Sequence, residues 1–142
     1  DWSSDVCSSD LIYCEADESW DKPSQAMGDI ILAIGARRGI AELPPTLNGR
    51  IGMIVDELKK RRLCIVVDEG HHMSGRTLNV LKTLLNKTPS SFVLAAQSTL
   101  WKKLQANAWQ EAKQLIFNRM FARIRLEGPS GLRPCGLPLP GY

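Results

Sequence analysis

The chain has 142 residues, of which 44% are hydrophobic and 23% are charged, and its formal net charge is +3. This length allows at most one domain, and the composition is typical of globular proteins and not of disordered or membrane-spanning chains. No apolar run approaches the roughly 18 residues of a membrane-spanning helix, and no signal peptide is recognised. Four cysteines without regular spacing favour a reducing compartment, so we expect a cytoplasmic protein that does not associate with a membrane.

The first eleven residues, DWSSDVCSSDL, resemble the conceptual translation of a common sequencing-library adapter. The adapter codons encode these residues in the same order, so we expect residues 1–11 to be non-native and set them aside, as one would a tag. Without Asp1, Asp5 and Asp10 the formal net charge changes from +3 to +6, because three negative charges are removed. The remaining chain is mildly basic, which permits a polyanionic partner such as DNA but does not require one.

Apolar runs alternate with amphipathic segments along the rest of the chain. The apolar runs predict strands over residues 11–16, 63–67, 91–96 and 122–126. The amphipathic segments predict helices over residues 24–38, 46–62, 77–86, 101–105 and 109–120. Strands that alternate with helices predict an α/β fold of three layers with a mainly parallel sheet.

Local signals predict where helices begin and where the domain ends. Ser24 is expected to cap the first helix, and Thr46 or Asn48 the second, because their side chains accept hydrogen bonds from free backbone N–H groups. We place the domain at residues 12–127. Residues 128–142 are rich in Gly and Pro without periodicity, so we expect an irregular tail there.

The segment Cys64-Ile65-Val66-Val67-Asp68-Glu69 carries the most chemical information. Four apolar residues predict a buried central strand, and two carboxylates follow at its carboxyl end, where open α/β sheets bind ligands. Asp68 can hold a hydrated Mg²⁺ ion, because hard cations prefer oxygen ligands. Glu69 can orient or polarise a water molecule for attack on a phosphoryl group.

Further polar groups follow the next predicted strand. Gln97, Ser98 and Thr99 come directly after it, so a parallel sheet brings them to the same edge as the two carboxylates. Ser98 or Thr99 can instead serve only to cap the following helix. Near the end of the last predicted helix lie Arg119 and Arg123, whose alternative role is to contact helix carbonyl groups or solvent.

With these three features in this order, residues 12–126 resemble AAA+ P-loop ATPases, in particular the phage Mu B type, which are ATP-dependent DNA-binding helpers of transposition. The resemblance implies that Asp68 and Glu69 form a Walker B motif with ATP and Mg²⁺ as cofactors. It implies that Gln97 is a sensor 1 residue between the attacking water and the γ-phosphate. It also implies that Arg119, or else Arg123, reaches the nucleotide of a neighbouring subunit in a homo-oligomer, with DNA and a transposase or recombinase as further partners.

The chain departs from this family in one respect, since it contains no GxxxxGK[ST] phosphate-binding loop. In the family that loop and the strand before it precede the segment that begins here at Ile12, and the strand lies between those at Phe92 and Arg123. We therefore expect an incomplete P-loop-type sheet that lacks its first strand. We also expect little or no nucleotide affinity, because the backbone amides and the lysine that hold phosphates are absent.

Three alternatives remain open. Asp68-Glu69-Gly70-His71 also resembles the DExH box of superfamily 2 helicases, although the strand that follows ends in AAQST and not in a Ser-Ala-Thr-like motif. A metal enzyme is a second alternative, with Glu69, His71 and His72 as ligands beside Asp68, although HExxH spacing is absent. A non-catalytic DNA-binding module is the third, through the basic clusters Arg37-Arg38, Lys59 to Arg62 and Lys102-Lys103.

Overall fold

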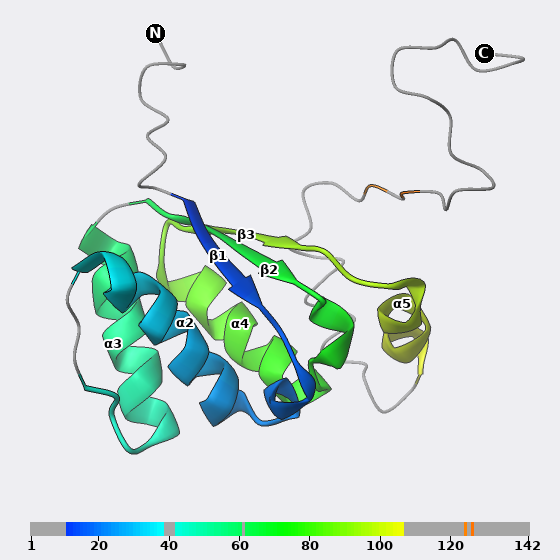
Figure 1. The fold of residues 1–142 in the computed structure, drawn as a ribbon, viewed down its shortest axis with the longest axis horizontal. Helices are drawn as coiled ribbons and strands as arrows, with labels where there is room; N and C mark the ends of the chain where they lie inside the picture. The colour runs from blue at the N-terminus through cyan, green and yellow to red at the C-terminus, as the bar shows by residue number, and fades with distance from the viewer. Residues whose placement is uncertain (1–10, 39–41, 61, 107–123, 125, 127–142) are drawn as a thin grey trace, which may run out of the picture.

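A computed structural model describes residues 11–38, 42–60, 62–106, 124 and 126 (Figure 1). Its strands are β1 (Leu11–Glu15), β2 (Cys64–Asp68) and β3 (Ser91–Leu94). Its α-helices are α2 (Pro23–Arg38), α3 (Leu47–Lys60), α4 (Gly75–Lys87) and α5 (Ser98–Gln105). Two short 3-10 helices, η2 (Glu18–Asp21) and η3 (Gly70–His72), follow the first two strands.

The three strands form one parallel sheet in the order β1-β2-β3, with β2 in the centre. Val66 lies opposite Tyr13 on one side and opposite Val93 on the other. Parallel neighbours need crossover connections, and the helices between the strands supply them. The predicted α/β fold with a parallel sheet and flanking helices is therefore confirmed as a partial P-loop-type arrangement. Among the described residues β3 pairs only with β2, so its other edge is the place for a further strand.

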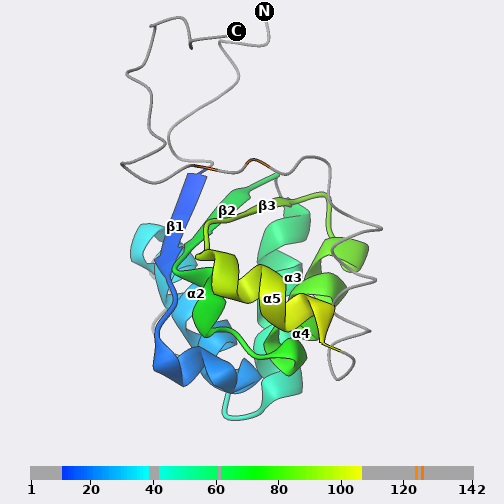
Figure 2. The same ribbon diagram turned by 90° about the vertical axis from the view of Figure 1, so that its right-hand side faces the viewer.

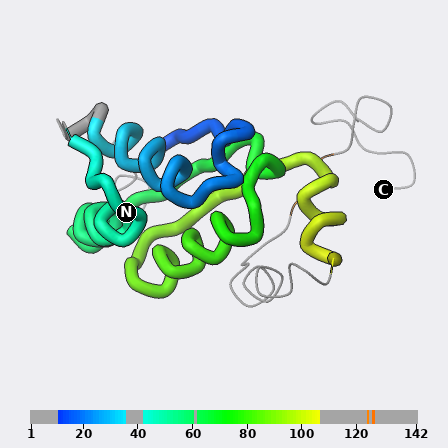
Figure 3. Tube along the Cα trace, turned by 90° about the horizontal axis from the view of Figure 1, so that it is seen from below, coloured from blue at the N-terminus to red at the C-terminus, as the bar shows by residue number. Residues whose placement is uncertain are grey.

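The core lies between the sheet and the helices α2, α3 and α4 (Figures 1 and 2). Alternate strand residues Ile12, Cys14, Ile65 and Val67 are at most 5% exposed, because a strand turns successive side chains to opposite faces. Figure 3 shows the molecule from the helix side, with α5 set apart at one end. In the described part of the chain, helices cover one face of the sheet, so two of the three expected layers are seen.

The opposite face of the sheet is open in the described part of the chain. Leu11, Tyr13 and Val93 are 48%, 54% and 50% exposed, and no described helix packs over them. We expected the central strand to be covered on both faces. Among the described residues this second cover is not seen.

The connection after β1 is tied to the start of α4. Trp20 is fully buried and its indole N–H donates to Asp29 Oδ2 at 2.7 Å. The Trp20 carbonyl accepts a hydrogen bond from Thr77 Oγ1 at 2.7 Å, and the Asp21 carbonyl accepts one from Ser74 Oγ at 2.6 Å. These bonds satisfy the carbonyl groups of the connection that follows β1. They also hold that connection against the start of α4 at the carboxyl edge of the sheet.

Two helix starts differ from the predictions. Helix α2 begins at Pro23, and Lys22 O accepts the first helical bond from Ala26 N, so Ser24 lies in the first turn and is not the cap. Proline suits the first helical position because its missing N–H would have no partner there. Helix α5 begins at Ser98, before the predicted start at residue 101, and its cap is Gln97 without a side-chain hydrogen bond, so the alternative that Ser98 or Thr99 caps this helix is wrong.

The start of α3 confirms Thr46, one of the two predicted caps, and not Asn48. Thr46 Oγ1 accepts a hydrogen bond from Gly49 N at 3.1 Å, and the helix begins at the next residue, Leu47. The predicted strand over residues 122–126 is not confirmed, because Ile124 and Leu126 belong to no strand and are 81% and 88% exposed. The predicted helix over residues 109–120 lies outside the described residues. The domain boundaries at 12–127 and 128–142 stay predictions.

Candidate functional site

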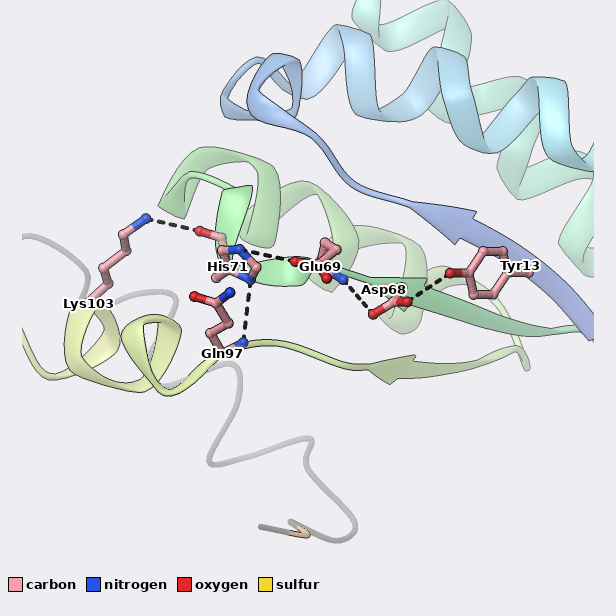
Figure 4. A network of polar contacts seen from close by, with 6 residues as sticks. All are labelled: Tyr13, Asp68, Glu69, His71, Gln97 and Lys103. Carbon is pink, nitrogen blue, oxygen red and sulfur yellow. Dashed lines mark hydrogen bonds and ion pairs between the residues drawn. The ribbon is translucent and has the colours of Figure 1, made fainter. Parts of the chain in front are cut away.

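The candidate site lies at the carboxyl edge of the sheet, where β2 ends in Asp68 and the chain continues through Glu69 into η3 (Figure 4). Tyr13 of the neighbouring strand donates its hydroxyl hydrogen bond to Asp68 Oδ2 at 2.8 Å. The backbone N–H of Glu69 donates to Asp68 Oδ1 at 2.8 Å. Both bonds favour the ionised carboxylate, and they hold the pKa of Asp68 below its usual value.

The same bond acts in the opposite direction on Tyr13. Its hydroxyl donates to a carboxylate, so loss of the phenol proton is disfavoured and the pKa of Tyr13 is raised. Each oxygen of Asp68 uses one lone pair in these contacts and has another left for a ligand. Asp68 can therefore accept a hydrogen bond from a metal-bound water while it keeps both of its protein partners. The oxygen donor set fits a hydrated Mg²⁺ ion.

Glu69 has an unusual backbone conformation. Its φ of 55° and ψ of 35° lie in the left-handed region, and it is the one non-glycine residue with positive φ among those described. Such a conformation is uncommon outside glycine, asparagine and aspartate, and it persists where the surroundings hold it. The turn directs the Glu69 carboxylate to His71, whose Nε2 lies 3.3 Å from Glu69 Oε2.

The ends of β2 and β3 are joined beyond the last strand residues. Ala95 N donates to Val67 O at 2.9 Å, and Gly70 N donates to Ala95 O at 2.8 Å. A Cβ added to Gly70 would lie 3.3 Å from Ala95 O and 3.3 Å from Met73 Cε, which is closer than ordinary contact. Glycine at position 70 therefore allows the two chain segments to approach each other.

Gln97 lies where the sequence predicts it, at this edge. Its backbone N–H donates to His71 Nδ1 at 3.4 Å, and its own side chain is exposed. Lys103 of α5 donates from Nζ to the His71 carbonyl at 3.0 Å. The edge thus brings together Asp68, Glu69 and Gln97 from the predicted set. Arg119 and Arg123 lie outside the described residues, so their position at the site stays a prediction.

A second metal site can be tested against this geometry. Ligand atoms of Glu69, His71 and His72 all lie within 4.8 Å of one another. However, Nδ1 of His71 accepts the Gln97 N–H, so a neutral ring carries its proton on Nε2, the nitrogen that faces Glu69. A metal ion bound there would have to displace that proton. The cluster therefore fits a hydrogen-bonded network better than it fits a transition-metal centre.

Comparison with known proteins identifies the family of this chain. A family model described as an AAA domain matches residues 3–104, more than half of the 142 residues. The chain belongs to the AAA domain family. A search of curated proteins found no match. Family membership makes this chain a fragment of an AAA-type P-loop ATPase. The finer resemblance to the phage Mu B type is not supported by that match.

Two residues of the AAA domain's polar edge were not predicted as part of the site. Tyr13 lies in a run that was interpreted only as a buried strand. Lys103 was considered only as part of a basic cluster that could contact DNA. The alternation of strand side chains puts Tyr13 and Asp68 on the same face, but their contact depends on the register between strands 55 residues apart. No local sequence signal specifies that register.

Two of the basic clusters, at Lys59-Lys60 and at Lys102-Lys103, do not form one surface in the described part of the chain. Lys59 and Lys60 end α3, which leads into the amino end of β2, and Lys60 pairs with Glu57 at 3.0 Å. Lys102 and Lys103 lie in α5, which follows the carboxyl end of β3 (Figure 1). The two pairs are therefore at opposite ends of the sheet. None of the described helices has the length and apolar character needed to cross a membrane.

Proposed function

We propose that this AAA domain contributes the Mg²⁺-binding and water-activating half of an ATP hydrolysis site. In this proposal Asp68 holds Mg²⁺ through water, and the ion supplies charge neutralisation on the phosphate oxygens. Glu69 accepts a proton from the attacking water or orients it, which is the role of a general base. The carrying observation is that Asp68, Glu69 and Gln97 meet at the carboxyl edge of a parallel sheet, where α/β folds bind ligands.

The remaining roles are also part of this proposal. Gln97 contacts the γ-phosphate from the end of β3, and Arg119 or Arg123 stabilises transition-state charge in the site of a neighbouring subunit. The protein then works as a homo-oligomer, and the trans arginine makes each site depend on its neighbour. Its partners are DNA and a transposase or recombinase, as in the Mu B type. The resemblance supports these partners, and the mildly basic charge is compatible with them.

The first experiment is to sequence the source gene across the codons before Leu11. A strand followed by GxxxxGK[ST] within about fifty codons supports the proposal, because that loop supplies the phosphate contacts the 142-residue chain lacks. A native reading frame without such a loop would refute it, and Asp68-Glu69 would then be only the capped end of a strand or part of a metal site.

The second experiment measures hydrolysis in the protein that contains this loop. Glu69→Gln is expected to keep ATP binding and to lower the hydrolysis rate by a factor on the order of 10² to 10⁴, because it removes the general base and keeps the side-chain shape. Glu15→Gln is the matched control, since Glu15 is an exposed carboxylate opposite Asp68 at the same edge. Equal rates for both variants would contradict the role of Glu69.

Measurements of DNA binding with and without ATP distinguish the proposed transposition helper from a basic DNA-binding module and from a helicase. The proposed helper binds DNA more tightly with ATP than without it. A basic module without catalysis would bind the DNA in a salt-dependent manner that ATP does not change and that survives Glu69→Gln. A helicase would instead couple hydrolysis to strand separation, which a duplex-unwinding assay measures directly.

A further inference from the structure

Three groups converge on His71 at the carboxyl edge, from β2, from the end of β3 and from α5 (Figure 4). Its Nε2 lies 3.3 Å from Glu69 Oε2, its Nδ1 lies 3.4 Å from Gln97 N, and its carbonyl oxygen accepts a bond from Lys103 Nζ at 3.0 Å. The His71 side chain is 13% exposed and that of Glu69 is 43% exposed. The imidazole is thus the better shielded member of the pair.

The contact with Gln97 determines which ring nitrogen of His71 carries the proton. A backbone N–H can only donate, so Nδ1 must supply a lone pair. In the neutral ring the single proton then resides on Nε2, which faces the Glu69 carboxylate. The imidazole therefore accepts on one side and donates on the other, and both contacts use the same tautomer.

We propose that His71 is a positioning residue for Glu69 and couples its carboxylate to the backbone of Gln97. This inference rests on the proposed function, in which Glu69 activates water. A neutral donor orients the carboxylate and leaves its negative charge, so Glu69 can still accept a proton. Because the other side of the ring is held by Gln97, a movement of the β3–α5 junction changes the position of the carboxylate. His71 itself contacts no reacting group.

The surroundings of Glu69 explain why such a residue is needed. The left-handed backbone at Glu69 turns its side chain away from the line of β2, and no other described hydrogen bond or ion pair orients its carboxylate. Misplacement of a reacting group by about 1 Å can lower a rate on the order of 10²-fold. The contact with His71 Nε2 at 3.3 Å favours one orientation of this partly exposed carboxylate.

The test uses nuclear magnetic resonance on the 142-residue chain, which contains two histidines. His72→Phe leaves His71 as the one source of imidazole signals, and it keeps an aromatic ring at position 72, where the native ring centroid lies 4.3 Å from that of His71. Long-range ¹H–¹⁵N spectra at about pH 8.5, where free histidine is neutral, distinguish the two tautomers. We expect the form with the proton on Nε2. The form with the proton on Nδ1, or an even mixture, would overturn the proposal.

Two substitutions of His71 then separate its two contacts. The amide nitrogen of His71→Gln can replace Nε2 as the donor to Glu69, whereas the shorter His71→Asn can replace only Nδ1 as the acceptor. We expect the ¹³C signal of the Glu69 carboxylate to stay near its wild-type position in His71→Gln and to move to that of an exposed glutamate in His71→Asn. Wild-type positions in both folded variants would show that His71 does not hold Glu69.

A titration of the unsubstituted chain, which keeps both histidines, with Zn²⁺ tests the metal alternative. Stoichiometric binding that removes the Nε2 proton and shifts both histidines would overturn the proposal in favour of a metal centre; unchanged spectra support it. These results are independent of ATP hydrolysis. If Glu69→Gln leaves hydrolysis unchanged but the tautomer is as expected, the proposed function fails and the contact stands. If Glu69→Gln abolishes hydrolysis but the tautomer is wrong, only this inference fails.

Discussion

The two faces of the sheet differ in burial and in the contacts that they make. On the helix-covered face, Ile12, Ile65 and Val67 are at most 2% exposed and form the centre of the core. On the open face, Tyr13 and Val93 are half exposed, and the same face carries the bond from Tyr13 to Asp68. The comparison teaches that one face supplies the free energy of folding, while the other positions the polar groups of the candidate site. Substitutions at matched positions on the two faces can break or sharpen this contrast.

The largest effect is expected at the centre of the covered face. Ile65→Ala should lower the free energy of unfolding by about 2–5 kcal/mol, because it removes buried methyl groups and leaves a cavity. Val93→Ala on the open face is the matched substitution and should cost less than about 1 kcal/mol, since half of that side chain is already in solvent. Urea denaturation of both variants measures the two values. Comparable losses would show that the open face is buried in solution.

An intermediate effect is expected where the covered face meets the loops of the carboxyl edge. Thr77 is fully buried, and its hydroxyl donates to the Trp20 carbonyl. Thr77→Val keeps the shape and removes the donor, so it should lower the free energy of unfolding by about 1–3 kcal/mol. Thr83→Val is the control, because Thr83 is only half-buried and its hydroxyl bonds to its own helix. Thermal unfolding that does not separate the two variants would argue against the Trp20 bond.

The smallest effect on stability is expected at Tyr13, and it should depend on pH. The bond from Tyr13 lowers the folded-state pKa of Asp68, so its contribution is present above about pH 4 and is lost as acid protonates Asp68. The bond also raises the pKa of Tyr13, so the same contribution is present below about pH 10 and is lost as the phenol ionises above it. The difference between the wild type and Tyr13→Phe should therefore be flat between these limits and shrink outside them.

Denaturation of both proteins between about pH 3 and pH 11 checks this profile. A carboxyl ¹³C titration of Asp68 supplies a direct readout, because Tyr13→Phe should move the pKa of Asp68 upward, towards its ordinary value. An unchanged pKa in the variant would mean that the hydroxyl and the carboxylate do not bond in solution.

The sequence predicts most of this fold because its signals are local and periodic. The apolar runs that contain Ile12, Ile65 and Phe92 each correspond to a strand, and the amphipathic repeat after Ser74 corresponds to α4. Helix starts were less predictable. Pro23 and Ser24 are both common near a helix start, so the sequence does not fix the first helical residue. The hydrogen bond from Ala26 N to Lys22 O places the start of α2 at Pro23.

The candidate site was predictable in its carboxylates but not in their partners. The position of Asp68 and Glu69 after a buried run, with Gln97 after the next run, follows from the geometry of parallel strands. The contacts of Tyr13 and His71 do not follow, because they depend on strand register and on the left-handed turn at Glu69. Neither the register nor that turn has a signature in the residues themselves.

Gly70 shows how narrow the choice of residues in this motif is. A Cβ at position 70 would make a tight contact of 3.3 Å with the Ala95 carbonyl oxygen, whereas the side chain of His72, two residues along, is partly open to solvent. A gene library randomised at both codons and selected for folded protein should be more enriched in glycine at 70 than in any one residue at 72, because a Cβ at 70 requires its neighbours to shift by a few tenths of an ångström. The spacing between the acidic pair and the histidine is thus protected by a residue with no chemistry of its own, and variants that preserve every reactive group can still be lost at this position.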